Sequence, residues 1–452
     1  MIGFGKHPSG LMPLFFTEMW ERFSFYGLNA LLVLYLVLPV AQGGLGYTTA
    51  RASLLYGNYV LAVYLFSIVG GYLADRLLGT GRAVMLGGAV IVCGHFSMAL
   101  GTHASLFVGL ACVAVGTGLL KPNISVLVGQ LYARDDNRRD AGFSLFYMGI
   151  NLGAFASPIV CGYLAQGEGF RLWLASAGFD ARHSWHWGFA AAGIGMLIGL
   201  ATFARYWPTL SGAGVSMRAA ESQESALATA AGGATRAETL RKLAVIGFFC
   251  FGAIVFSIAL KQSGASLSLF ADRLTRNEIF GWSFPSSWFQ SVAPAMVMVL
   301  APCFSLLWLR LDQRQPSSPA KVVIGLVLGT LSFVILVFAA QAAVSGRVSP
   351  WWLLSVYFVT TLGELCISPV GLSNVTRLAP PALVGLMMGM WFGAIGLGGK
   401  IAGVFSSWLN LDDLTQLPGI FAWQAAIIAA GCVIVALLMP WARRVMRQSG
   451  LE

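Results

Sequence analysis

The chain contains few charged residues. Only 10% of its 452 residues are Asp, Glu, Lys or Arg, whereas 57% are hydrophobic, and soluble domains carry about 25% charged residues. This scarcity excludes a soluble globular protein as well as the disordered, collagen-like and small disulfide-rich classes. The net charge is +10, but the basic residues lie in short breaks between apolar runs, so no nucleic-acid partner is expected.

Catalytic and metal-binding motifs are also lacking. The 7 cysteines stand singly in apolar stretches, which indicates neither a zinc site nor a disulfide framework. An intramembrane enzyme, the main alternative class, would need a nucleophile with its base or a metal cluster, yet no HExxH or GxSxG motif occurs. The glycines before Lys400 mimic a phosphate loop, but Ile401 stands where Ser or Thr is required. We therefore expect no enzyme activity, no catalytic residue, no cofactor, no metal and no ATP-driven step.

Long apolar runs are abundant instead. A membrane-spanning helix needs about 20 apolar residues, and the runs here do not alternate between apolar and polar as barrel strands do. The first run is too long for a cleaved signal peptide. Twelve runs qualify: 14–40, 52–75, 82–100, 105–131, 141–165, 186–207, 242–271, 288–309, 321–343, 350–377, 383–409 and 420–441. The prediction is an all-α membrane protein with twelve transmembrane helices.

The runs fall into two halves of six. A polar stretch rich in Ala, Ser, Gly and Thr, residues 208–241, separates them, and residues 146–153 resemble residues 391–398 in the second half. Many secondary transporters are built from two such halves. We predict an N-terminal six-helix bundle at 1–207, a cytoplasmic linker at 208–241 and a C-terminal six-helix bundle at 242–452.

The basic residues predict the orientation. Most of the 28 Lys and Arg residues lie in connections on the same side as the N-terminus, and such connections are normally cytoplasmic. Both termini are therefore expected inside, in a plasma membrane and most simply a bacterial inner membrane. Residues 71–82, GYLADRLLGTGR, resemble the cytoplasmic signature loop of the major facilitator superfamily, and this resemblance implies the fold of that superfamily.

Seven ionisable residues lie inside the predicted spans. Each costs roughly 2.5–3.5 kcal/mol at the bilayer centre, so we expect them to pair or to face a water-filled cavity. They are Glu18, Glu21, Arg22, Lys121, Lys261, Glu364 and Lys400. Four cations cannot all pair with three anions, which leaves at least one cation for water, a titrating group or an anionic substrate. Lys400 could reach an interface, pair with an acid or face the cavity.

The first span carries the densest cluster. Glu18, Glu21, Arg22, Phe25 and Asn29 recur at three- and four-residue spacing, so they share one helical face. Two carboxylates one turn apart around a guanidinium can share a proton. A static salt-bridge cluster is the structural alternative. A channel is a third class, but two halves with opposing charges favour alternating access.

Four motifs resemble one family. Residues 18–27, EMWERFSFYG, are similar to the ExxERFxYYG motif of the proton-coupled oligopeptide transporters, with Phe25 in place of the first Tyr. Residues 121–123, KPN, resemble the lysine motif of the fourth helix. The fifth-span FYMGINLG at 146–153 and the tenth-span GELCISPVGL at 363–372 resemble the FYxxINxG and GELxxSPxGL segments. The resemblance extends over both halves of the chain.

The resemblance implies a proton-coupled symporter that imports di- and tripeptides by alternating access, with membrane lipid as its surroundings and a monomer as its functional unit. Glu18, Glu21 and Arg22 would couple proton binding to gating. Arg22 and Lys121 would hold the carboxylate of the peptide, and Glu364 its ammonium group. Residues that could line side-chain pockets, or pack between helices, are Tyr26, Tyr56, Tyr64, Tyr147, Asn151 and Trp391.

The alternative within transporters is a proton-coupled carrier of another small zwitterion, an anion or a peptide-like drug. Glu364 argues against a purely anionic substrate, because such a substrate has no use for a carboxylate. Lys261, which precedes Gln262, favours an anionic substrate instead, since the family usually has an acid at this position. Lys261, Gln262 and Ser368 are candidate gate or substrate residues. A lysine in place of this acid could change the extracellular gate, the number of protons carried per substrate or the preferred charge of the substrate.

The linker marks a second departure from the family. Many bacterial relatives carry two additional helices between the halves. Some 34 residues of Ala- and Ser-rich sequence at 208–241 cannot supply two spans of about 20 residues each. We therefore expect twelve helices and not fourteen.

Overall fold

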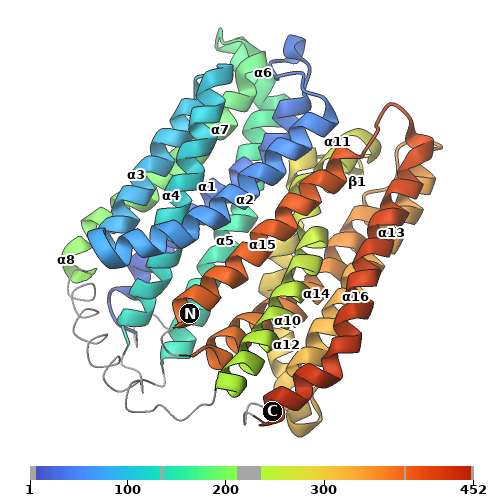
Figure 1. The fold of residues 1–452 in the computed structure, drawn as a ribbon. Helices are drawn as coiled ribbons and strands as arrows, with labels where there is room; N and C mark the ends of the chain where they lie inside the picture. Colours follow the sequence, from blue (N-terminus) through green and yellow to red (C-terminus); the bar gives the residue numbers. More distant parts are fainter. Residues whose placement is uncertain (1–6, 133–135, 137, 211–235, 381–382, 449–452) are drawn as a thin grey trace. The chain divides into compact units, whose positions relative to one another are not determined.

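The computed structural model describes residues 7–132, 136, 138–210, 236–380 and 383–448. Within these ranges the chain is helical apart from one short hairpin (Figure 1). The long helices are α1 (Leu11–Val37), α2 (Thr49–Leu73), α3 (Thr80–Ala99), α4 (His103–Gln130), α5 (Arg139–Gln166), α7 (Ser184–Arg205), α10 (Arg236–Leu260), α12 (Val292–Leu311), α13 (Ser318–Ala343), α14 (Trp351–Leu378), α15 (Val384–Ser407) and α16 (Leu417–Gln448). The all-helical prediction is confirmed.

Eleven helical segments of the described chain are long and apolar enough to cross a membrane. Helix α1 is not among them, although its 27 residues exceed the length of a span. Its charged residues Glu18, Glu21 and Arg22 lower its hydropathy. With α1 included, each of the twelve predicted runs coincides with one helical segment, and the boundaries differ by a few residues.

The seventh run is the one that departs from a continuous helix. A 3₁₀ segment, η5 (Lys261–Gly264), separates α10 from α11 (Ser266–Leu274). The joint residue Ala265 has φ −130° and ψ −97°, outside the helical region. Short 3₁₀ stretches inside a helix often mark functional hinges. The predicted span 242–271 is thus two helices joined by a turn.

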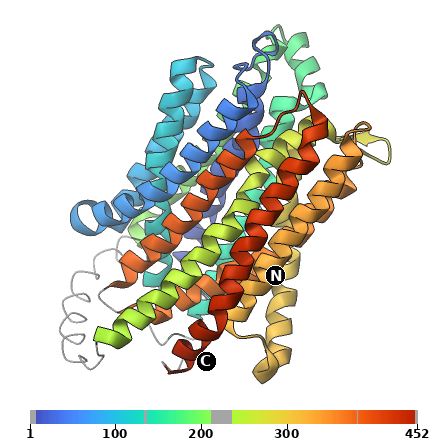
Figure 2. The same cartoon turned by 45° about the vertical axis from the view of Figure 1, so that its right-hand side comes forward.

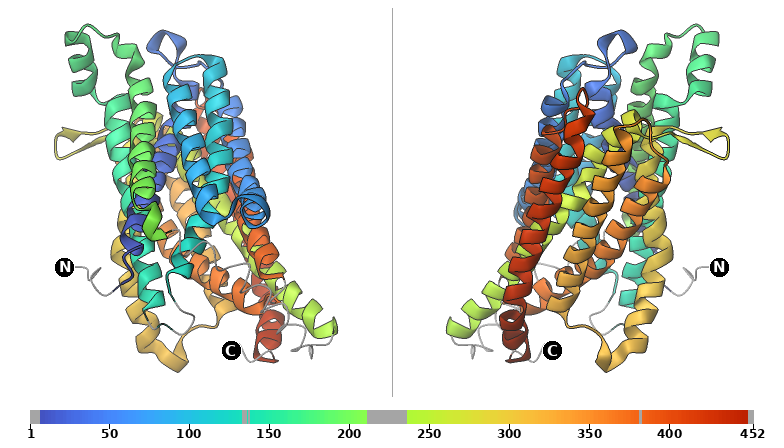
Figure 3. Two further views of the ribbon diagram at one scale, coloured as in Figure 1. Left: turned by 90° about the vertical axis from the view of Figure 1, so that its left-hand side faces the viewer. Right: turned by 90° about the vertical axis from the view of Figure 1, so that its right-hand side faces the viewer.

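The structure also contains short elements that the sequence analysis did not predict. They are α6 (Glu168–Ser176), α8 (Trp207–Leu210), η6 (Ser286–Ser291) and a hairpin of β1 (Glu278–Ile279) and β2 (Trp282–Ser283). Phe280 and Gly281 form its two-residue loop, both with positive φ, as tight hairpin turns require. The hairpin projects away from the helices that it joins (Figure 3), and the Phe280 side chain is 99% exposed.

The chain divides into two compact units. The first comprises 1–48, 62–219 and 277–295, and the second comprises 49–61, 220–276 and 296–452. Residues 211–235, most of the expected linker, lie outside the described residues. Each unit therefore contains one segment from the other half of the sequence.

In the first unit, α3 packs tightly on α4, and α1 packs on α5 and α7. Glycines permit the close approach: a Cβ atom at Gly116 would lie 2.6 Å from the carbonyl oxygen of Gly87. The segment 277–295 joins this unit through η6. Ser291 Oγ donates to the Phe155 carbonyl at 2.7 Å, and Trp288 Nε1 donates to the Ile159 carbonyl at 3.1 Å, both on α5.

In the second unit, α13 packs on α14 and α16, and α10 packs on α15 and α16. The start of α2, residues 49–61, lies against α15. A Cβ atom at Gly403 would be 2.7 Å from the Gly57 Cα atom, so neither position has room for a larger residue. Ser53 Oγ and Ser406 Oγ lie 2.9 Å apart and are hydrogen bonded.

Candidate functional site

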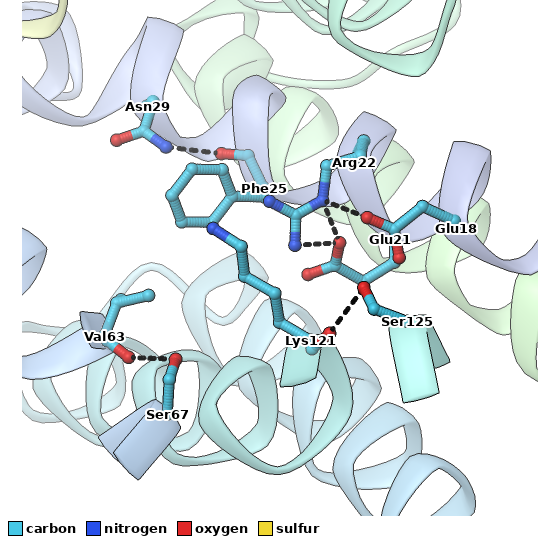
Figure 4. Close-up of polar contacts among 9 residues, drawn as sticks. All are labelled: Glu18, Glu21, Arg22, Phe25, Asn29, Val63, Ser67, Lys121 and Ser125. Carbon is cyan, nitrogen blue, oxygen red and sulfur yellow. Dashed lines mark hydrogen bonds and ion pairs between the residues drawn. The ribbon is translucent and has the colours of Figure 1, made fainter. Parts of the chain in front are cut away.

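The charged residues of α1 form one buried cluster. The exposed fractions of Glu18, Glu21 and Arg22 are 2%, 0% and 3%. Arg22 Nε lies 3.1 Å from Glu18 Oε1, one turn away, and the guanidinium also contacts Glu21 Oε2 (Figure 4). A single guanidinium thus forms ion pairs with two carboxylates, as their spacing in the sequence predicts.

Each carboxylate keeps one oxygen without a partner. Glu18 Oε2 and Glu21 Oε1 are buried and accept no hydrogen bond from any described residue. Two carboxylates this close repel each other, and protonation of either would remove one of the two negative charges.

Helix α4 adds a second cation. The Lys121 side chain reaches toward Phe25 and Arg22 in Figure 4, and its charge acts electrostatically on Glu18. Lys121 Nζ lies 4.8 Å from the centroid of the Tyr64 ring on α2, within cation–π range. Arg22 makes a similar contact with Phe25, at 5.1 Å. Two acids and two cations from α1 and α4 thus come together in the first unit.

The remaining candidates of the first unit lie on α1 and α5. Tyr26 is partly exposed, and its ring meets that of Phe25 edge-on at 5.4 Å. Tyr147 is 44% exposed, whereas Asn151 is buried and donates from Nδ2 to the Tyr147 carbonyl at 3.0 Å. Asn29, which shares the charged face of α1, donates to the Phe25 carbonyl at 2.8 Å.

In the second unit, Lys261 and Gln262 lie in the break between α10 and α11. Gln262 is fully buried; its Nε2 donates to the Ala402 carbonyl of α15 at 3.3 Å, and its Oε1 accepts from the Ser266 hydroxyl. Lys261 Cγ would lie 3.5 Å from a Cβ atom at Gly399 of α15. Both residues of the pair, Lys261 and Gln262, therefore lie against α15.

Glu364 of α14 is the one acid of the second unit that the sequence singles out. Its carboxylate makes no hydrogen bond and no ion pair with the described residues, and Lys261 is the cation that acts on it electrostatically. Lys400 has a different partner, because its Nζ donates to Asn58 Oδ1 on α2. No pattern in the sequence indicates Asn58, which lies 342 residues away.

Trp391 and Ser368 complete the predicted set. Trp391 is 3% exposed, and its indole fills the space beside Gly371, where a Cβ atom would be only 2.0 Å away. This packing of α15 on α14 favours the structural interpretation of Trp391. Ser368 is partly exposed on α14, one turn after Glu364.

Known sequences resemble this chain over nearly its full length. The family model of the POT family matches residues 81–211 and 215–423. The peptide transporter YePEPT of Yersinia enterocolitica subsp. palearctica is 36% identical, and the match covers 99% of this chain and 96% of that protein. A di-/tripeptide transporter of Lactococcus lactis subsp. cremoris is 34% identical, with 86% and 87% covered.

Solved structures agree with the sequence matches. A peptide transporter POT in complex with alafosfalin superposes with a TM-score of 0.86 at 34% identity, covering 98% of this chain and 96% of that one. A POT family transporter bound to 5-aminolevulinic acid gives a TM-score of 0.81 at 28% identity, covering 97% and 98%. The predicted twelve-helix major facilitator fold, in two six-helix bundles, is therefore confirmed. Because the motifs, the family model and the full-length relatives agree, this chain belongs to the POT family of membrane transporters.

Proposed function

We propose that the chain is a symporter that imports di- and tripeptides together with protons by alternating access. The observation that carries the proposal is the α1 cluster, in which two buried carboxylates share one arginine. Family membership and the peptide-transporting relatives support the substrate class.

The proton step follows from the shared guanidinium. Protonation of Glu18 or Glu21 weakens the attraction of that acid for Arg22. The arginine then becomes available, with Lys121, for the carboxylate of a peptide, which a guanidinium can bind with two parallel hydrogen bonds. Substrate and proton in this way stabilise the same charge state of the cluster, and their binding is coupled.

Glu364 is the proposed ligand of the peptide ammonium group. It has no ion pair among the residues that the structure describes, so its carboxylate does not have to leave a protein partner to bind substrate. A peptide carries one charge of each sign at neutral pH, whatever its side chains. Cations for one end and an acid for the other therefore bind peptides in a defined direction with broad side-chain tolerance.

The membrane arrangement is part of the proposal. Both termini would lie in the cytoplasm of a bacterial cell, because most of the basic residues fall on that side. The functional divisions would be 1–207, 208–241 and 242–452, and one copy embedded in membrane lipid would suffice for transport.

Reconstituted vesicles test the proposal directly. Purified protein in proteoliposomes should accumulate a labelled dipeptide when the outside is acidic, and accumulation should collapse when an ionophore dissipates the proton gradient. Empty liposomes control for leakage. Accumulation that is indifferent to the ionophore would contradict proton coupling.

A small non-peptide zwitterion is the second candidate substrate. It is favoured by a POT family relative of similar structure that was solved with 5-aminolevulinic acid, a molecule with one amine and one carboxylate. Competition decides between the two: excess unlabelled dipeptide should suppress dipeptide uptake at lower concentration than 5-aminolevulinic acid does. The reverse order would make the non-peptide zwitterion the preferred substrate.

A further inference from the structure

An apolar groove separates α10 from α16 in the second unit. The two helices lie side by side (Figure 2), and a cavity of about 580 Å³ opens between them. Its walls include Gly247, Phe248 and Phe251 from α10 and Ile434, Leu438 and Trp441 from α16. Gly247 helps to create the space, because a Cβ atom there would meet nothing within 4 Å. No residue of the peptide or proton machinery proposed above lines the groove.

The groove is open toward the surroundings of the helices. Ile434, Leu438 and Trp441 are 46%, 42% and 37% exposed. Since α10 and α16 both belong to segments that can cross a membrane, this exposed apolar surface faces hydrocarbon chains. A volume of this size is in the range of small-molecule sites, and an elongated apolar chain fits its lining.

One end of the groove is basic. Arg241 precedes the lining residue Ala244 by three positions, and Arg444 follows Trp441 by three, so each arginine lies one helical turn, about 5 Å, beyond the lining. The start of α10 and the end of α16 lie at the same end of the pair (Figure 2). Both arginines are exposed.

The neighbouring acid does not neutralise this end. Glu238 forms an ion pair with Lys242 at 2.8 Å, and this single acid is outnumbered by the cations of the two helix ends. Arg447 adds a further exposed positive charge one turn after Arg444. The mouth of the groove therefore carries a net positive charge where the apolar lining ends.

We propose that this groove is a binding site for an anionic phospholipid, with an acyl chain in the cavity and the phosphate between Arg241 and Arg444. Guanidinium groups bind phosphate oxygens with paired, charge-assisted hydrogen bonds. Basic pockets between transmembrane helices are suited to anionic headgroups, and Trp441 stands where indole rings prefer the interface. A zwitterionic lipid offers the same chain, but its own cation offsets the attraction. The occupant is thus a phosphatidylglycerol-type lipid.

Native mass spectrometry of the full-length protein in detergent tests the headgroup preference. Dioleoyl phosphatidylglycerol should be retained several-fold more than dioleoyl phosphatidylcholine at equal concentration. The double variant Arg241→Gln and Arg444→Gln should lower phosphatidylglycerol retention to the phosphatidylcholine level and leave phosphatidylcholine unchanged. Equal retention of the two lipids by the unmodified protein would overturn the proposal and would indicate annular lipid only.

A second pair of variants tests the cavity. Gly247→Leu adds a side chain at the wall of the groove, where a Cβ atom has free space, and should lower phosphatidylglycerol retention. Gly419→Leu is the matched control, since a Cβ atom at Gly419, near the opposite end of α16, also meets nothing within 4 Å. Thermal unfolding without added lipid verifies that both variants fold. If correctly folded Gly247→Leu protein retains as much phosphatidylglycerol as the control, the lipid does not occupy this groove.

Discussion

At the residue scale, the second acid of the α1 cluster gives the most direct test of proton coupling. Glu21 is fully buried and ion-paired with Arg22, so Glu21→Gln keeps the shape and removes the carboxylate. We expect proton-driven accumulation of dipeptide in proteoliposomes to fall at least tenfold, whereas exchange of labelled for unlabelled peptide, which needs no net proton flow, persists.

The matched control for this variant is Glu168→Gln, an exposed acid at the start of α6. It should transport like the unmodified protein. An equal loss of accumulation and exchange in correctly folded Glu21→Gln protein would show that Glu21 serves binding or structure and not coupling.

Glu364, which makes no ion pair with the residues that the structure describes, predicts a selective defect. A hydrogen bond to a charged group contributes about 1.5–3 kcal/mol, which corresponds to a change in affinity of roughly 10- to 150-fold. Glu364→Gln should therefore weaken competition by a dipeptide with a free amine by that factor and hardly change competition by its N-acetylated form. Equal weakening of competition by the free and the N-acetylated dipeptide would show that Glu364 does not bind the ammonium group.

Lys261 bears on the charge of the preferred substrate. It is the cation that acts electrostatically on Glu364, and it stands where the resemblance to the family leads us to expect an acid. Lys261→Gln should shift competition from dipeptides with an acidic side chain toward those with a basic one, by several-fold. An unchanged ratio would assign Lys261 to gating.

Residue contacts were predictable only where they are local. The common face of Glu18, Glu21 and Arg22 follows from helical periodicity, because all three lie within five consecutive residues. The contacts of Lys400 with Asn58 and of Trp391 with Gly371 depend on how separate helices pack. One sequence contains no periodicity that reports such packing.

At the scale of elements, the break after α10 is closely packed and therefore sensitive to substitution. Gly264 ends the 3₁₀ segment, and a Cβ atom there would be 2.2 Å from the Tyr56 hydroxyl oxygen and 2.6 Å from its ring. Tyr56 is buried, so the ring has little room to yield. Gly264→Ala should lower stability by about 1–3 kcal/mol, as overpacking does, and reduce uptake.

Thermal unfolding in detergent and vesicle uptake measure these two effects. Gly393→Ala is the control, because a Cβ atom at Gly393 on α15 meets nothing within 4 Å. If Gly264→Ala behaves like Gly393→Ala, the turn does not depend on close contact with Tyr56.

The elements themselves were largely predictable, since twenty apolar residues in a row permit few structures other than a transmembrane helix. Elements shorter than a span were not. Helix α6 has nine residues, and the hairpin has two residues in each strand, so neither produces a hydropathy signal. The break at Lys261–Gly264 was hidden for another reason: it lies within a run that is apolar on average, and hydropathy over such a run is the same with or without a turn.

At the scale of the whole molecule, the proposed mechanism predicts that transport moves charge. A peptide with uncharged side chains is neutral overall, so each accompanying proton carries one net charge inward. A membrane potential of 100 mV contributes about 2.3 kcal/mol per charge, equivalent to roughly 40-fold accumulation for one proton.

The prediction is measurable without a pH gradient. Proteoliposomes loaded with potassium and treated with valinomycin develop an inside-negative potential, which should drive dipeptide accumulation at equal pH on both sides. Glu21→Gln should abolish this accumulation, because without a proton the neutral peptide carries no charge for the potential to act on. Glu168→Gln should retain it. Accumulation in Glu21→Gln vesicles would mean that a group other than Glu21 carries the transported proton. No accumulation in vesicles with the unmodified protein would mean that the peptide crosses the membrane without a net charge.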